Sequence, residues 1–236
     1  MGKENQVAGA QKNAQADTRV VLFGASGHAR VTADILERSG LFEIVGLIVS
    51  NLPVGTTRFG YRVLGSEVDL PVLIEQYRVQ AGSIGVGENW ARSQFLARIE
   101  RTCPTLRFVT AVHPSAQIGR DVIIGDGTVI MAGAVVNSGS EIGQFSIVNT
   151  KASLDHDGRM GAFTSLAPGA TVGGNVVIGD FSAISLGAAV IQRVRIGSHT
   201  VIGAGAVVIQ DVPDRVVAFG VPAVVVKSRD PGDEYL

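Results

Sequence analysis

The sequence has little of the cysteine and aromatic content from which many proteins build disulfides, metal sites or a core. Cys103 is its one cysteine among 236 residues. An internal disulfide and a zinc site built from several thiolates are therefore excluded, and we expect a reducing, cytoplasmic location. Aromatic residues make up 6% of the chain, against 30 glycines. This balance favours a repetitive architecture over an ordinary globular core.

Long hydrophobic runs and an excess of one charge are also missing. No stretch reaches the roughly 18 apolar residues that a membrane helix needs. Residues 1–17 are polar and lack the apolar segment of a secretory signal, so we expect them to form a disordered tail. The formal net charge is -1, which gives no long-range attraction to nucleic acid or to an anionic membrane. A small-molecule partner is favoured instead.

What the sequence does have is a six-residue repeat. Every sixth residue from Val112 to Val208 is aliphatic, the residue four positions later is small or β-branched, and glycine often follows the aliphatic residue directly. A helix of 3.6 residues per turn cannot keep one face at a spacing of six. A coil with three six-residue sides can, because each side points one aliphatic side chain into a triangular prism. The repeat therefore predicts a parallel β-helix, roughly 27 Å long at the usual strand spacing.

The residues before the repeat predict a small α/β domain. A buried strand begins at Arg19 and runs into the glycine turn GASGH at 24–28, and a helical pattern covers 29–38. Further strands are expected at 42–49 and 82–87, and a helix at 88–101. Strand-to-helix turns of this kind can hold a phosphate at the helix N-terminus. A second turn, GVGENWAR at 85–92, should face the same crevice.

Several motifs together resemble one family. GASGHA at 24–29, IGVGEN at 84–89, HPSA at 113–116, the hexapeptide repeat and FGVPA at 219–223 are similar to the left-handed β-helix acyltransferases, in the branch of the sialic acid O-acetyltransferases and the UDP-4-amino-sugar (bacillosamine) N-acetyltransferases. The resemblance covers about residues 19–227. It implies a left-handed prism, a Rossmann-like domain that binds a nucleotide-sugar, acetyl-CoA along the prism, no metal, and a homotrimer with active sites between subunits.

The expected organisation follows from the repeat and the resemblance. We expect a tail at 1–17, a nucleotide-sugar-binding α/β domain at 18–110, a β-helix acetyltransferase domain at 111–213 and a closing segment at 214–236. The resemblance implies N-acetylation of a nucleotide-linked 4-amino-deoxysugar by direct attack in a ternary complex, as used to build bacterial surface polysaccharides. An O-acetyltransferase of sialic acid or a related sugar is the alternative. A metal-using prism ranks last, because only His156 and His199 are available late in the repeat.

The segment SLDHDG at 153–158 carries the candidate base. His156 lies two residues after the inward-facing Leu154, so its ring should project from the prism. A carboxylate on one ring nitrogen fixes the tautomer and makes the other nitrogen a better base. In the resembling enzymes a histidine followed by an acidic residue is the catalytic pair, which His156 and Asp157 match. A solvated turn without a catalytic role is the alternative.

The resemblance also implies the remaining site residues. An oxyanion contact from a backbone N–H falls on Gly174. Where the family has a second histidine that contacts acetyl-CoA, this chain has Ser165. The other expected acetyl-CoA contacts are Gly174, Leu186, Gly187, Ala204, Gly205, Val221 and Pro222. The expected nucleotide-sugar contacts are Gly24, Ser26, Gly27, His28, Ser50, Asn51, Gly87 and Asn89. Prism geometry alone would also explain the small residues, and His28 would in the alternative cap the following helix.

Overall fold

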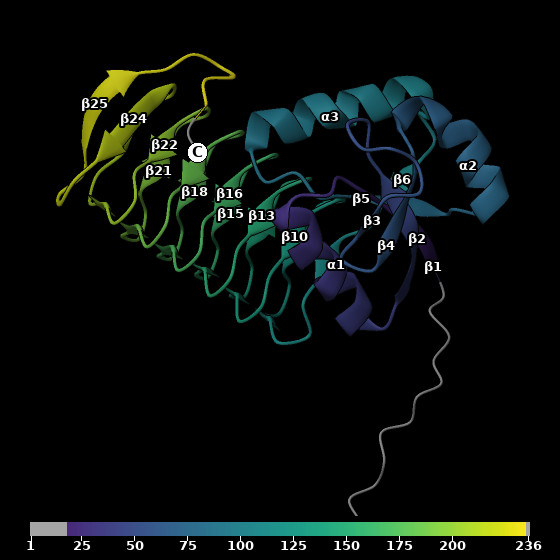
Figure 1. Ribbon diagram of the computed structural model, residues 1–236. Helices are drawn as coiled ribbons and strands as arrows, with labels where there is room; N and C mark the ends of the chain where they lie inside the picture. Colours follow the sequence, from purple (N-terminus) through teal and green to yellow (C-terminus); the bar gives the residue numbers. More distant parts are fainter. Residues whose placement is uncertain (1–17, 235–236) are drawn as a thin grey trace, which may run out of the picture.

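The computed structural model describes residues 18–234, in which an α/β layer lies beside one end of a three-sided prism (Figure 1). The expected fold class, a Rossmann-like domain followed by a parallel β-helix, is confirmed. The expected tail at 1–17 lies outside the described residues. Among residues 18–234, no helix is both long and apolar enough to cross a membrane. The division at residues 110 and 213 stays a proposal.

The N-terminal layer is a mostly parallel sheet with helices packed against it. Its strand order is β3-β4-β2-β1-β5-β6, and β3 pairs antiparallel with β4. The strands are β1 (Thr18–Phe23), β2 (Phe42–Ile48), β3 (Thr57–Arg58), β4 (Tyr61–Gly65), β5 (Ala81–Ile84) and β6 (Arg107–Phe108). The helices are α1 (Gly27–Ser39), a 3-10 turn η1 (Glu67–Asp69), α2 (Leu70–Tyr77) and α3 (Asn89–Thr102). No helix or strand was predicted within residues 57–77. The bounds of β1, β2, β5, α1 and α3 lie close to those of the predicted segments.

The two glycine turns meet at the carboxyl edge of this sheet. Because β1 and β5 are parallel neighbours, the turns that follow them leave the same edge. The hydroxyl of Ser26 donates to the carbonyl oxygen of Gly85 at 3.2 Å. A Cβ on Gly24, which has φ +109°, would lie 3.2 Å from the same oxygen. The positive φ, which other residues rarely adopt, and this close approach together explain the glycine at position 24.

The prism has three faces, each made of strands stacked 18 residues apart, as in the pairing of Ile130 with Val148. The first face contains β7 (Ala111–Val112), β10 (Val129–Ile130), β13 (Ile147–Val148), β16 (Ser165–Leu166), β19 (Ala183–Ile184) and β22 (Val201–Ile202), and continues into β24 (Val216–Phe219) and β25 (Val224–Ser228). The second face contains β8 (Gln117–Ile118), β11 (Val135–Val136), β14 (Ser153–Leu154), β17 (Thr171–Val172), β20 (Ala189–Val190) and β23 (Val207–Val208). The third face contains β9 (Ile123–Ile124), β12 (Glu141–Ile142), β15 (Arg159–Met160), β18 (Val177–Ile178) and β21 (Arg195–Ile196).

We call the corner from the first to the second face the first edge, the next corner the second edge, and the return to the first face the third edge. The repeat's aliphatic side chains fill the prism: Leu154 and Ile184 are fully buried. Ile118, in the first coil, is 39% exposed because the end of the prism leaves it without a complete layer of neighbours.

Buried hydroxyl groups hold successive coils together at the third edge. Ser146 donates to the carbonyl oxygen of Gly161 at 2.9 Å and accepts from the N–H of Thr164 at 3.1 Å. Ser182 repeats both bonds two coils further, donating to the Gly197 carbonyl oxygen at 2.6 Å. The small position of the repeat is therefore polar here because a hydroxyl satisfies backbone groups that the turn leaves unpaired.

A stack of rings along the third edge fixes α3 on the prism. Phe145, Phe163, Phe181 and His199 lie face to face, with ring centroids 5.4, 5.1 and 4.7 Å apart. Trp90 of α3 packs on this stack, 5.6 Å from the Phe181 ring. Figure 1 shows the start of α3 beside the prism and the rest of the helix over the N-terminal sheet. The start of α3 and the glycine turn before it are thereby held against the first face.

The inward aliphatic column generates a prediction about stability. Ile178 is 1% exposed in the prism core, and Val54 is 71% exposed in a loop. Ile178→Ala should lower the free energy of unfolding by about 2–5 kcal/mol, because it removes buried methylene groups and leaves a cavity. Val54→Ala should change it by less than about 0.5 kcal/mol. Chemical denaturation measures both, and equal effects would contradict the inward assignment.

Candidate active site

His156 projects from the second edge of the prism, directly after β14. Its side chain is 57% exposed, and its Nδ1 lies 2.8 Å from Oδ2 of Asp157. This hydrogen bond is the main cause of a raised pKa for His156. Desolvation opposes it, and the nearby charges of Asp155 and Asp157 add smaller effects that raise the pKa. With the Nδ1 proton donated to Asp157, Nε2 is the basic nitrogen and faces away from that carboxylate.

Asp155 bonds to the backbone of the turn, whereas Asp157 bonds to the ring of His156. One carboxylate oxygen of Asp155 accepts the backbone N–H of His156 at 2.8 Å and the side-chain amide of Asn137 at 2.6 Å. The bond from Asn137 is the main cause of a lowered pKa for Asp155. The turn thus holds two carboxylates with separate tasks, one on the backbone and one on the imidazole.

Gly174 lies beneath the imidazole in the next coil. A Cβ at this position would stand 2.5 Å from Nε2 of His156, so any other residue would displace the ring. Within residues 18–234, the N–H of Gly174 has no hydrogen-bond acceptor. The basic nitrogen and an available backbone donor therefore share one small site, as the assignment of His156 and Gly174 requires.

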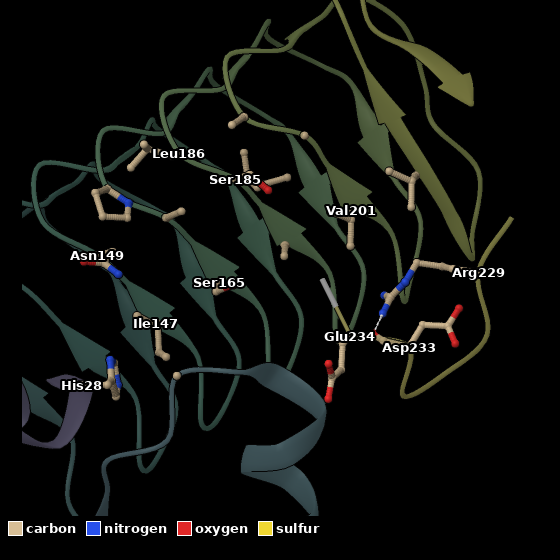
Figure 2. A pocket seen from close by; sticks show the side chains of 18 of the residues that line it. His28, Ile147, Asn149, Ser165, Ser185, Leu186, Val201, Arg229, Asp233 and Glu234 are labelled. Atoms are coloured by element: carbon tan, nitrogen blue, oxygen red, sulfur yellow. Dashed lines mark hydrogen bonds between the residues drawn. The ribbon is translucent and has the colours of Figure 1, made fainter. Parts of the chain in front are cut away.

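A cavity of about 720 Å³ lies on the first face and first edge. Figure 2 shows His28 at one end, Ser165 and Leu186 along the prism wall, and Arg229 at the other end. Of the expected acetyl-CoA contacts, Ser165, Leu186 and Ala204 line this cavity. Gly187 and Gly205 directly follow two of these residues, Val221 and Pro222 lie in the turn between β24 and β25, and none of these four is part of the lining.

A second cavity, of about 710 Å³, lies at the carboxyl edge of the N-terminal sheet. The expected nucleotide-sugar contacts Gly24, Ser26, Ser50, Asn51 and Gly87 line it, and Gly27 does not. Gly87 also lines the cavity on the prism. The two cavities therefore adjoin at the turn before α3. A coenzyme bound on the prism and a nucleotide-sugar bound on the sheet would meet there.

Some residues in these cavities were not predicted from the sequence. Arg58 reaches the sheet cavity from β3, a two-residue strand too short to produce a pattern. Asn149 and Ser185 line the prism cavity. Each directly follows an inward-facing aliphatic residue of the first face, so both belong to one series of residues spaced 18 apart in the sequence. A search of that series for polar residues would have found both.

His28 lies at the junction of the two cavities and is held neutral. Burial, followed by the positive charge of Arg92, lowers the pKa of His28 to about 4. Its Nε2 is buried without a hydrogen-bond partner among residues 18–234. The alternative role as a helix cap does not apply, because Ser26 caps α1 by accepting from the N–H of Ala29 at 3.4 Å. His28 thus presents an uncharged imidazole beside the prism cavity.

Asn89 and Cys103 do not face these cavities. Asn89 is 1% exposed, and its side chain bonds to Ser165 and Ser182 of the prism, so it is absent from the lining of either cavity. Cys103 ends α3, is 8% exposed, and has a pKa raised by burial. A thiol in this state is a poor nucleophile.

The expected catalytic residues and the expected acetyl-CoA contacts therefore lie on different parts of one chain. His156, Asp157 and Gly174 lie on the second edge, whereas the prism cavity lies on the first face and first edge. The second face separates them, and His156 is absent from the lining of both cavities. One chain alone does not bring the candidate base to the cavity.

Comparisons with known proteins agree with this architecture. The model for the PglD N-terminal domain matches residues 19–99. A histidine-to-alanine mutant of GDP-perosamine N-acetyl transferase from Caulobacter crescentus, solved with CoA and GDP-perosamine, is 34% identical, with a TM-score of 0.84 over 90% of this chain and 99% of that one. The acetyltransferase domain of PglB from Neisseria gonorrhoeae, solved with acetyl coenzyme A, is 32% identical, with a TM-score of 0.80 over 88% and 98%.

Two further relatives are more distant or longer. WeeI from Acinetobacter baumannii is 27% identical, with a TM-score of 0.77 over 89% of this chain and 100% of that one. Uncharacterized protein L142 of Acanthamoeba polyphaga mimivirus is 31% identical over 129 residues. The chain spans only 24% of that curated relative's length, and the match covers 55% of this chain.

The bond between His156 and Asp157 generates a prediction about titration. Asp157→Asn should lower the pKa of His156 toward its ordinary value of about 6.5, because the carboxylate is what raises it. Titration of the imidazole C–H resonances by NMR measures the change. Asp155→Asn removes a charge but leaves the bond to Nδ1, so it should lower the pKa less. An unchanged pKa in Asp157→Asn would contradict the assignment.

Proposed function

The chain belongs to the left-handed β-helix acyltransferases, in the branch that includes nucleotide-sugar N-acetyltransferases, and we propose that it transfers an acetyl group from acetyl-CoA to the amino group of a nucleotide-linked 4-amino-deoxysugar. The observation that carries the proposal is the imidazole of His156, which is bonded to Asp157 and lies over Gly174. GDP-perosamine is the first acceptor to test, because the relative that is 34% identical over 99% of its length was solved with it.

The proposed chemistry needs no covalent enzyme intermediate. A thioester is already an activated acyl donor, so the sugar amine attacks the acetyl carbonyl carbon directly in a ternary complex. Nε2 of His156 takes the proton that the amine loses as the new C–N bond forms. The available N–H of Gly174 donates to the developing oxyanion. The C–S bond then breaks, and the CoA thiolate leaves and takes up a proton.

The proposed ligand positions follow the two adjoining cavities. The nucleotide occupies the sheet cavity, where the first glycine turn and the N-terminus of α1 offer backbone N–H groups to phosphate. Acetyl-CoA occupies the prism cavity beside Ser165, Leu186 and Ala204. The sugar then extends past Gly87 and His28 toward the thioester. We include Gly187, Gly205, Val221 and Pro222 as contacts for the remoter parts of the coenzyme.

A homotrimer completes the site in this proposal. Because the second face separates His156 from the prism cavity in one chain, a neighbouring subunit must supply the base. Cyclic assembly brings one edge of each subunit against a different edge of the next. The exposed side chain of Ile191 lies on the second edge, where such a contact would cover it. We further propose that the enzyme works in the cytoplasm in surface polysaccharide biosynthesis.

An acceptor panel tests the proposal. Purified protein and acetyl-CoA are incubated with GDP-perosamine, with UDP- and dTDP-linked 4-amino sugars, and separately with sialic acid, and thiol release is followed. We expect release with a nucleotide-linked amino sugar. His156→Ala should reduce turnover by about 10²- to 10⁴-fold, because it removes the general base.

The controls separate the base from the assembly. His113→Ala changes another histidine of the prism, which lines neither cavity, and it should leave turnover within about twofold. Light scattering should give the same trimer mass for both variants. Activity on sialic acid alone would replace N-acetylation by the O-acetyl alternative, and full turnover in His156→Ala would remove the base assignment.

A further inference from the structure

We propose that Arg92 is a positioning residue, acting through Asn89 to hold the hydroxyl of Ser165 as a hydrogen-bond donor toward an acceptor oxygen of the acyl-CoA. The inference rests on the proposed function, since it takes acetyl-CoA as the occupant of the prism cavity. It assigns a task to a buried cation that the proposed reaction does not otherwise use. It also states in which direction the hydroxyl group of Ser165 donates its hydrogen bond. Ser165 is the position where the resembling enzymes have a histidine.

The guanidinium of Arg92 is 1% exposed between α3 and the prism. Its Nε donates to the carbonyl oxygen of Phe145 at 2.7 Å, and one terminal nitrogen donates to the carbonyl oxygens of Val86 at 3.0 Å and Gly87 at 2.8 Å. These bonds tie the second glycine turn to the third edge. The other terminal nitrogen donates to Oδ1 of Asn89 at 2.6 Å, which points the network toward the cavity.

The orientation of the Asn89 amide follows from its neighbours. A guanidinium can only donate, so the Asn89 oxygen must face Arg92. The carbonyl oxygen of Ser182 can only accept, so the Asn89 nitrogen must face the prism, where the two atoms are 3.0 Å apart. The same nitrogen lies 3.3 Å from Oγ of Ser165. Arg92 and the prism backbone therefore exclude the flipped amide.

This orientation fixes what the Ser165 hydroxyl can do. Facing an amide nitrogen, its oxygen accepts, and its own hydrogen must point elsewhere. Within residues 18–234, the Ser165 hydroxyl has no acceptor, and the side chain lines the prism cavity. Figure 2 shows Ser165 on the cavity wall between Asn149 and Val201. The hydrogen is thus available to an oxygen atom in the cavity, such as the thioester or an amide carbonyl of acyl-CoA.

The isosteric change Asn89→Asp tests this direction. A carboxylate still accepts from Arg92, but it cannot donate, so the bond to the Ser182 carbonyl oxygen is lost. The Ser165 hydroxyl turns to donate to the carboxylate and is lost to the cavity. We expect the Kd for acetyl-CoA, measured by calorimetry without acceptor, to rise about three- to tenfold, the value of one hydrogen bond. Ser165→Ala should raise it by a similar factor. Ser165→Thr, which keeps the hydroxyl, should raise it less than Ser165→Ala does.

The double variant separates positioning from a general loss of structure. Asn89→Asp combined with Ser165→Ala should weaken acetyl-CoA binding no more than the stronger single change, because both remove the same bond. The KM for the nucleotide-sugar should stay unchanged in all of them. Arg92→Lys, where melting shows that it folds, should also add nothing to Ser165→Ala. If it does not fold, the Asn89 and Ser165 variants decide the question.

The outcomes distinguish this inference from the proposed reaction. Multiplicative losses in the double variant, an unchanged Kd in Ser165→Ala, or effects confined to the nucleotide-sugar would overturn the positioning role. Tight binding of acetyl-CoA without acetylation of any amino sugar would overturn the proposed acceptor, and the Kd comparison would still decide the role of Arg92. A wild-type protein that does not bind acetyl-CoA would overturn both.

Discussion

The structure depends on one constraint, the pairing of each strand with the strand 18 residues later. This register places residues 18 apart in columns along each edge, so a glycine or a ring at one level meets a chosen neighbour at the next. Gly174 lies beneath His156 for this reason. The stacked rings from Phe145 to His199 that carry α3 follow the same rule. Loss of register by one residue would turn every inward side chain outward.

The register also explains why the proposed chemistry is divided between parts of the surface. The proposed base at the second edge and the cavity on the first face each follow from the residues stacked at their own position, yet the second face lies between them. The N-terminal domain contributes a second cavity that adjoins the first at Gly87. An assembly that apposes different edges would join these parts without any change of fold. In this account, oligomerisation is a requirement of catalysis.

The sequence predicted the features that depend on local pattern. The six-residue repeat predicted the prism, and the position of His156 two residues after Leu154 predicted that its ring points outward. It missed β3, β4 and α2, because short strands and an eight-residue helix leave too few residues for a periodic signal. The sequence analysis also predicted Asn89 as a nucleotide-sugar contact. The bonds of Asn89 to Ser165 and Ser182 join residues at least 76 positions apart, and no local pattern encodes such contacts.

The most direct test of the divided site is complementation between two inactive subunits. His156→Ala removes the base, and Leu186→Arg fills the prism cavity from an exposed position. The two variants are coexpressed with different tags, and mixed oligomers are purified through both. If each site takes its base from one chain and its cavity from the next, about one third of the sites in mixed trimers are intact, and activity should return to about one third of wild type. Mixed oligomers as inactive as the single variants would contradict the account.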